Sequence, residues 1–151
     1  MTQQIEYRLY TFSHQYLSPL QKGLQTAHLV EELNLKYNVA GNAGWRSLQG
    51  NVKSAYNILT EWGKFHKTII ILNGFNSANL LKIYNELFEI CESLSLPFAK
   101  FNEDESLNNA LTCVGIVVPM TIINKRMRGE MEFCTPQDKL QELIKGYGLA
   151  N

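Results

Sequence analysis

The chain has 151 residues, of which 45% are hydrophobic, 11% are aromatic and 19% are charged. A length of about 150 residues suits one globular domain that buries most of its apolar surface, so we expect a single domain over residues 1–151. Fourteen Lys and Arg balance fourteen Asp and Glu. This neutrality argues against a protein that coats long nucleic acids, because such proteins usually carry a basic excess.

The three cysteines are widely spaced, at Cys91, Cys113 and Cys134. They lack the spacing of a zinc knuckle or a redox Cys-x-x-Cys, and the histidines lack metal-ligand spacing with them, so we expect free thiols, no metal and no cofactor. The N-terminal sequence has no secretory pattern, and the apolar runs are too short to span a bilayer. We therefore expect a soluble cytoplasmic protein (host cytoplasm for a viral protein) that does not bind membranes.

The first part of the chain predicts a strand followed by a helix. Apolar and polar residues alternate along Ile5–Tyr10, which is typical of a half-buried strand. Ser18 can cap a helix and form a capping box with Gln21, and Pro19 suits its first turn. The helical spacing of apolar residues continues to about Tyr37.

A loop, a second helix and a second strand follow. Residues 38–50 are rich in Asn and Gly, which favours a loop. A helix is predicted from about Val52, with Gly63 as its stop. The β-branched run Thr68–Leu72 predicts a central strand that is buried on both faces.

The second half of the chain predicts a helix, two strands and a final helix. Ser77 is expected to cap the third helix, which ends before Pro97. Phe98–Phe101 is a short third strand, and the apolar run Ala110–Val118 is a fourth. Thr135 then opens the last helix, and the preceding segment, from residue 120 to residue 134, is predicted to be irregular.

The predicted order is β, α, α, β, α, β, β, α. Apolar strands separated by helices indicate an α/β fold with three layers, in which a mixed, mostly parallel four-stranded sheet carries helices on both faces. Ligands should gather at the carboxyl ends of the strands. The junction between the first strand and the helix after Ser18 is therefore the first place to expect a site.

The first candidate site lies on that helix. Gln21, Gln25 and His28 stand at i, i+4 and i+7 and share one face, with Lys22 on the flank. The alternative is a solvated helix face with a partly buried histidine, and the spacing alone favours that alternative.

The second candidate is the turn before the fourth strand, where Glu103, Asp104 and Glu105 are consecutive. Three carboxylates on a turn are most often a solvated surface. A functional role requires one of them to pair with Lys22 or His28 for proton transfer. The local sequence does not decide between these two interpretations.

The third candidate is the basic group Lys125, Arg126 and Arg128. Arg suits bidentate contact with phosphate, so this group could hold a nucleotide. A solvated loop is the more common explanation of such a group. One patch of this size cannot track a duplex.

Four segments together resemble the type-2 peptidyl-tRNA hydrolase superfamily, especially its divergent bacterial and phage branch. They are Leu17–His28, which ends in Gln-x-x-His, Leu59–Trp62, Leu94–Phe101 and Thr112–Pro119. The similarity extends from Arg8 to Pro119. Each motif is weak alone, but their order and spacing make the resemblance fairly specific.

The resemblance implies a fold of this family and a hydrolase that cleaves the ester between a peptide and the 3′ end of a tRNA. It implies a helix-opening Lys, a His, an Asp on the acidic turn and a strand Thr as working residues. His28 and Thr112 match directly, and Asp104 (or Glu103) is the acid. Gln21 stands where the family has Lys, and Lys22 follows one residue later, a rotation of about 100° on a helix.

The expected site residues follow from these candidates and the resemblance. The catalytic set is Lys22, His28, Asp104 and Thr112. The ligand-binding set is Gln21, Gln25, Glu103, Asn108, Asn109, Lys125, Arg126 and Arg128.

Three functions are compatible with the sequence. The first is a peptidyl-tRNA hydrolase-like protein that recognises an RNA 3′ end or a nucleotide and hydrolyses an ester or phosphodiester. The second is a phage counter-defence protein that sequesters or cleaves a cyclic nucleotide immune messenger, with Trp45 or Tyr16 stacking on a base. The third is an interaction module without a ligand. The expected partners are a nucleotide or tRNA 3′ end and a second copy of the chain, because family members are often dimeric.

Overall fold

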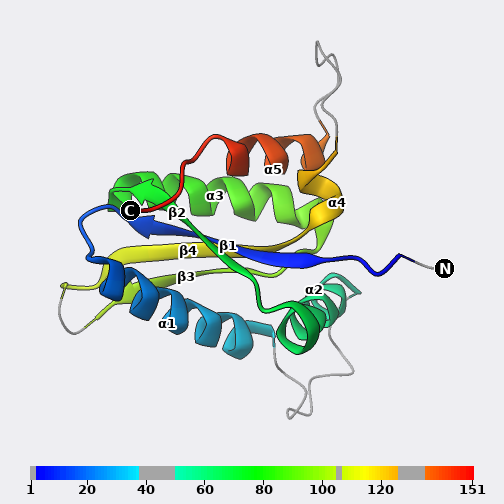
Figure 1. Cartoon of the computed structure of the whole chain (residues 1–151), viewed down its shortest axis with the longest axis horizontal. Helices are drawn as coiled ribbons and strands as arrows, with labels where there is room; N and C mark the ends of the chain where they lie inside the picture. Colours follow the sequence, from blue (N-terminus) through cyan, green and yellow to red (C-terminus); the bar gives the residue numbers. More distant parts are fainter. Residues whose placement is uncertain (1–2, 38–49, 105–106, 126–134) are drawn as a thin grey trace.

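The computed structural model describes residues 3–37, 50–104, 107–125 and 135–151 (Figure 1). The elements in chain order are β1 (Tyr7–His14), α1 (Pro19–Tyr37), α2 (Gly50–Glu61), η2 (Trp62–His66), β2 (Ile69–Phe75), α3 (Ser77–Leu94), β3 (Phe98–Glu103), β4 (Ala110–Pro119), α4 (Met120–Ile123) and α5 (Pro136–Lys145). The predicted order of strands and helices is confirmed. The short helix α4 lies where an irregular segment was predicted. None of the described helices is long and apolar enough to cross a bilayer.

The four strands form one mixed sheet in the order β2-β1-β4-β3. β1 and β2 are parallel, whereas β4 is antiparallel to both of its neighbours, β1 and β3. The predicted four-stranded mixed sheet is confirmed, but the prediction of mostly parallel pairing is wrong. The reason is that β3 and β4 are joined by a short turn, and parallel strands need a longer crossover connection.

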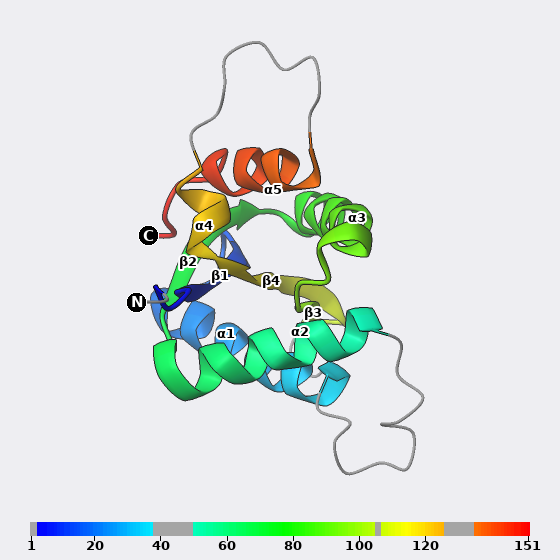
Figure 2. The same cartoon turned by 90° about the vertical axis from the view of Figure 1, so that its right-hand side faces the viewer.

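Helices cover both faces of the sheet, so the predicted three layers are confirmed (Figure 2). Successive side chains of β1 point to opposite faces, as in any strand. Leu9 packs with Leu29 in a core cluster on the α1 and α2 face. Phe12 packs with Leu87 in a second cluster on the α3 and α5 face.

The start of α1 is the predicted capping box. The Gln21 N–H donates to Ser18 Oγ at 3.2 Å, and the Ser18 N–H donates to Gln21 Oε1 at 2.9 Å. Each side chain satisfies one backbone donor that a helix start leaves without a partner. The Gln21 side chain is therefore committed to the helix end.

The second helix does not stop at Gly63 as predicted. It continues from α2 into the π-helical turn η2, and Lys67 ends that turn in the left-handed conformation with φ of 55°. The Lys67 N–H donates to the backbone oxygen of Trp62 at 2.9 Å. Trp62 is buried, and its indole N–H donates to the Thr68 oxygen at 3.0 Å. Anchoring of this tryptophan explains why the helix continues past a residue that often ends helices.

The cap of α3 is Asn76, one residue before the predicted Ser77. Asn76 Oδ1 accepts from the Asn79 N–H at 2.9 Å, which is the ordinary role of a capping side chain. The Ser77 hydroxyl instead donates to the Leu111 oxygen at 3.0 Å and ties α3 to β4. The Ser77 hydroxyl, which local sequence predicted as the cap, therefore bonds to a distant residue instead.

The strand predicted over Thr68–Leu72 is β2, and its predicted central position is wrong. β2 is the last strand on its side of the order, and Ile69 is 39% exposed. The segment 148–150 runs beside it: the Asn73 N–H donates to the Gly148 oxygen at 2.9 Å, and the Ala150 N–H donates to the Ile71 oxygen at 3.0 Å. This segment covers part of the outer edge of β2. The continuous apolar run in β2 had predicted a central strand instead.

Candidate functional site

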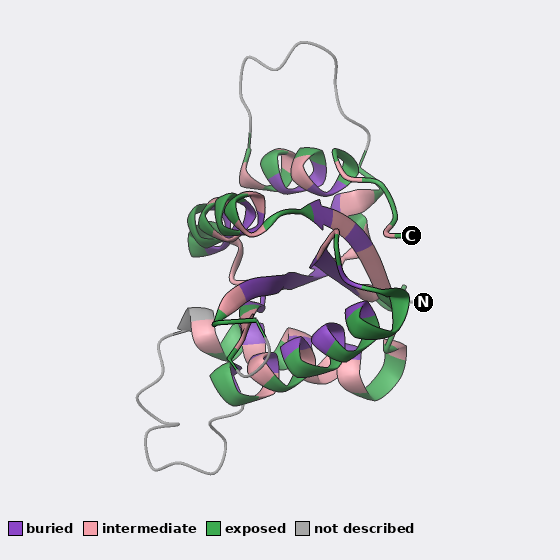
Figure 3. Cartoon of the chain, turned by 90° about the vertical axis from the view of Figure 1, so that its left-hand side faces the viewer, coloured by how far each residue is buried: buried purple, intermediate pink, exposed green. Residues whose placement is uncertain are grey.

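The candidate site lies where the carboxyl ends of β1, β2 and β3 meet the start of β4. β3 runs in the same direction as β1 and β2, because each of β1 and β3 is antiparallel to β4. Figure 3 looks onto this end of the molecule, where one side of α1 is buried and the other is exposed. The expected junction between β1 and α1 is at this end.

A β-bulge in β4 sets the direction of Thr112. Phe101 pairs with Cys113 and Asn102 pairs with Leu111, so Thr112 is an extra residue in the ladder. Thr112 and Cys113 both face α1 as a result, although neighbouring strand residues ordinarily point to opposite faces. Thr112 is only 1% exposed.

Thr112, Gln25 and Glu103 form a hydrogen-bonded chain. The Thr112 hydroxyl donates to Gln25 Oε1 at 2.6 Å, and Gln25 Nε2 donates to Glu103 Oε2 at 2.9 Å. Gln25 is buried, and both ends of its side-chain amide are hydrogen-bonded, the oxygen to Thr112 and the nitrogen to Glu103. The two bonds orient the Glu103 carboxylate toward α1.

The two carboxylates of the acidic turn differ in how they are held. Glu103 is half-buried and fixed by Gln25, whereas Asp104 is exposed and has no hydrogen bond within the described part of the chain. Of the two acids that the resemblance suggested, Glu103 is the one the fold orients. Glu105 lies outside the described residues.

His28 stacks on Phe101, with ring centroids 4.7 Å apart and planes inclined by 15°. His28 is exposed, and this ring contact joins α1 to β3 next to Glu103. The sequence reasoning missed Phe101 as the partner of His28. The period-2 spacing of Phe101 and Glu103 could have placed both on the α1 face of β3.

Lys22 lies three residues before Gln25 on the buried face of α1, but it is not part of this chain of bonds. Its ammonium donates to the backbone oxygen of Asn151 at 2.8 Å, and the residue is only 7% exposed. Segment 148–150, held on the edge of β2, brings Asn151 to this position. Gln21, which stands where the family has Lys, is exposed and bonded to Ser18. Neither residue contacts Glu103 or Asp104 through a hydrogen bond in the described part of the chain.

Asn108 and Asn109 form the tight turn before β4. Their φ values are 50° and 60°, and the Ala110 N–H closes the turn on the Leu107 oxygen at 3.0 Å. Asn tolerates this left-handed conformation better than most residues. The turn geometry therefore explains the presence of Asn at both positions. Both are exposed at the candidate site.

Lys125, the described residue of the basic group, is not brought to this site. Lys125 follows α4 at the other end of β4, and its ammonium lies 3.2 Å from Asp138 Oδ1 at the start of α5. Arg126, Arg128 and Trp45 lie outside the described residues. Tyr16 is described and is 82% exposed, with its ring 5.6 Å from that of His14.

Two of the cysteines are poor nucleophiles. Burial raises the pKa of the Cys113 thiol to about 12 and the pKa of the Cys91 thiol to about 12. Because the thiolate is the reactive form, both thiols are suited to the core. Over the described ranges, no three His, Cys, Asp or Glu side chains lie together as a metal site would require.

The chain was compared with family models and with curated proteins. No family model matches it, and no curated protein matches its sequence.

Proposed function

We propose that this protein is a peptidyl-tRNA hydrolase-like protein that recognises the 3′ end of an RNA, or a nucleotide, beside α1, β3 and the start of β4. The observation that carries the proposal is the chain of bonds from Thr112 through Gln25 to Glu103. It joins three segments, far apart in sequence, that the resemblance singled out independently. A shared contact among such segments supports a common site.

The site offers two kinds of contact to such a ligand. The exposed ring of His28, backed by Phe101, provides a flat aromatic surface, and bases stack on such surfaces with little dependence on sequence. Glu103 provides an oriented carboxylate that can accept a hydrogen bond from a ribose hydroxyl or from water. A compact ligand of this kind is compatible with the neutral net charge.

Ester hydrolysis would use the same carboxylate. Glu103 accepts a proton from a water molecule as the water oxygen attacks the ester carbonyl, and it returns that proton to the 3′ oxygen as the bond from the carbonyl carbon to that oxygen breaks. Gln25 and Thr112 act as positioning residues, because they hold Glu103 and do not themselves exchange a proton. Lys22 can stabilise the developing oxyanion only after its ammonium leaves the Asn151 oxygen.

The test compares neighbouring carboxylates. Turnover of an N-acetylaminoacyl-tRNA is measured for the wild type, Glu103→Gln and Asp104→Asn. We expect Glu103→Gln to lower kcat/KM by about 100-fold or more, as loss of a general base does. Asp104→Asn is the matched control, and we expect kcat/KM within about threefold of the wild type because Asp104 has no fixed orientation.

Recognition is tested separately from turnover, by titration with intact tRNA, with tRNA lacking its 3′ nucleotides and with a cyclic dinucleotide. We expect binding of intact tRNA and a loss of affinity when the 3′ nucleotides are removed. Equal affinity for both tRNAs, or binding of the cyclic dinucleotide alone, would contradict the proposal. Full turnover by Glu103→Gln would remove Glu103 from the chemistry.

A further inference from the structure

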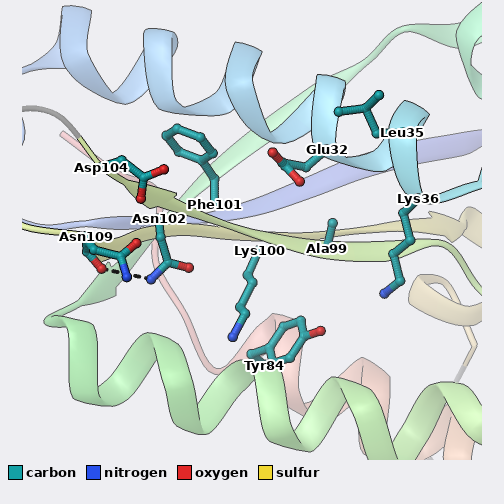
Figure 4. A pocket seen from close by; sticks show the side chains of 10 residues that line it. All are labelled: Glu32, Leu35, Lys36, Tyr84, Ala99, Lys100, Phe101, Asn102, Asp104 and Asn109. Carbon is teal, nitrogen blue, oxygen red and sulfur yellow. Dashed lines mark hydrogen bonds between the residues drawn. The ribbon is translucent and has the colours of Figure 1, made fainter.

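A groove of about 720 Å³ runs along the outer edge of β3, between α1 and α3 (Figure 4). β3 is the last strand in the sheet order, so no strand of the described residues pairs with its outer side. The groove adjoins the candidate site, because Phe101 and Asp104 line it on either side of Asn102 and Glu103.

The N-terminal end of this edge, at Phe98, is not available to an added strand because its peptide groups already have partners. Phe98 directs its peptide groups outward: its N–H donates to the Tyr37 hydroxyl at 3.2 Å, and its oxygen accepts from the Lys36 ammonium at 2.8 Å. Burial lowers the pKa of Lys36 and raises the pKa of Tyr37 to about 12. Covering the edge in this way blocks strand addition at Phe98.

The edge is open two residues later, at Lys100. The Val117 N–H donates to the Pro97 oxygen at 2.9 Å, so the peptide groups of Pro97 and then Ala99 face β4. Peptide groups alternate in direction along an antiparallel ladder, which turns the N–H and C=O of Lys100 outward like those of Phe98. No hydrogen bond to either group occurs within the described residues. An extended peptide offers a complementary donor and acceptor together.

The two walls of the groove differ in charge. Lys100 extends toward α3, where its ammonium lies 4.8 Å from the centre of the Tyr84 ring. Glu32 and Asp104 lie on the α1 side (Figure 4), and Lys36, which also comes from α1, has its ammonium bonded to the Phe98 oxygen. Successive side chains of an added strand point to opposite faces, so acidic residues would meet Lys100 and basic residues would meet the two carboxylates.

We propose that this groove binds an extended peptide of alternating charge, which adds to β3 as an outer strand anchored on the N–H and C=O of Lys100. The inference rests on the proposed function in one respect: it assigns the peptide part of a peptidyl-tRNA to this groove. The strand addition itself is independent of any RNA and is tested without it. The seal at Phe98 limits the bound length to a few residues, because a strand advances by about 3.3 Å per residue.

The test measures binding of acetyl-Glu-Lys-Glu-Lys amide to the full chain by NMR titration of backbone amides. Lys100→Pro removes the outward N–H without affecting the ladder to β4, whereas Lys100→Ala keeps that N–H. Both variants lack the ammonium, so the difference between them reports the backbone contact. We expect Lys100→Pro to bind about fivefold more weakly than Lys100→Ala, the effect of one hydrogen bond.

A second form of the test leaves the protein unchanged, in case Lys100→Pro does not fold. The same peptide with its backbone nitrogens methylated cannot donate a hydrogen bond to the Lys100 oxygen, and we expect at least a fivefold loss of affinity for the wild type. Equal affinity of the methylated and plain peptides would overturn the proposal, as would amide shifts confined to other surfaces. Dimerisation that competes with the peptide would assign the edge to a second copy and overturn it too.

The outcome is separable from that of the proposed function. Peptide binding without turnover or recognition of tRNA would remove the proposed function and retain the groove. Turnover that Lys100→Pro and Lys100→Ala support equally, with no peptide binding, would retain the function and remove the groove.

Discussion

The two faces of the sheet bury different kinds of side chain. The face under α3 and α5 packs apolar residues, including Phe12, Leu80 and Leu87. The α1 face contains nearly all the buried polar residues among those described, namely Thr11, Ser13, Lys22, Gln25, Thr26 and Thr112, whereas Gln141 belongs to α5 on the opposite face. Burial of a polar group costs free energy unless the group is hydrogen-bonded. The need for stability therefore does not by itself explain why polar residues are buried on the α1 face.

The polar groups of the α1 face are also unequal among themselves. Thr112 bonds to Gln25 and Gln25 bonds to Glu103, whereas the Thr11 and Ser13 hydroxyls have no partner within the described residues. The α1 face therefore contains an organised hydrogen-bond network and, beside it, hydroxyls that contribute little to stability. The predictions that follow begin with the largest expected effect, and the last concerns a residue outside this contrast.

The apolar face should show the largest stability loss. Leu87 is fully buried in the core cluster under α3. We expect Leu87→Ala to lower the free energy of unfolding by about 2–5 kcal/mol, since truncation of a buried leucine leaves a cavity. Urea unfolding measures this loss, and tRNA binding by the folded fraction should be unchanged. A loss below 1 kcal/mol, on the order of an exposed-site substitution, would contradict the assigned burial.

The network should show a smaller loss of stability combined with a loss of function. Thr112→Val removes the donor to Gln25 and leaves a buried acceptor without a partner, which costs about 1–3 kcal/mol. Thr11→Val is the matched control on the same face, and it should be neutral or stabilising because its hydroxyl has no partner. Urea unfolding of both variants checks the prediction. Equal losses would show that the hydrogen bond to Gln25 is not what distinguishes them.

The contact between Lys22 and Asn151 should be released by a change on the edge of β2. Ala150→Pro removes the N–H that donates to the Ile71 oxygen, at a cost of about 1 kcal/mol. We expect Lys22 to react faster with acetic anhydride, as measured by peptide mass spectrometry. Leu149→Pro is the control, since the Leu149 N–H is not part of that ladder. Unchanged reactivity of Lys22 in Ala150→Pro would mean that segment 148–151 does not protect it.

The smallest effect should come from Asp138, outside the compared faces. Hydrogen bonds from Thr135, with the nearby Lys125, lower the pKa of Asp138 below its ordinary value of 3.8. A lowered carboxyl pKa stabilises the fold above the unfolded value, and this stabilisation is lost as the pH falls through the folded value. We expect the stability difference between the wild type and Asp138→Asn to be constant above about pH 5 and to shrink below about pH 4. Urea titrations across this range measure it, and a difference independent of pH would contradict the role of the carboxylate.

Local sequence was sufficient where short-range interactions decide the structure. The capping box of Ser18 and Gln21, the Thr135 cap of α5 and the apolar run of β4 were all predictable, because each depends on residues within a few positions of one another. The misplaced cap at Ser77 has the opposite cause. Its hydroxyl bonds to Leu111, a partner 34 residues away.

The candidate site was predictable as a set of residues but not as an arrangement. The Gln-x-x-His pattern and the strand Thr pointed to Gln25, His28 and Thr112. The choice of Glu103 over Asp104 depends on a bond to Gln25, 78 residues away. The position of Lys22 depends on Asn151, 129 residues away.

Local patterns in the sequence are enough to specify the element order, the α/β class and the first and last helix starts, because hydrophobic periodicity and capping depend on neighbouring residues. The tertiary structure alone decided which strands are neighbours, where the ladder of β4 bulges and which polar groups meet beneath α1. Strand neighbours and side-chain networks depend on packing between distant segments, and no local pattern encodes the free energy of those contacts. The open edge of β3 and its groove belong to this second group.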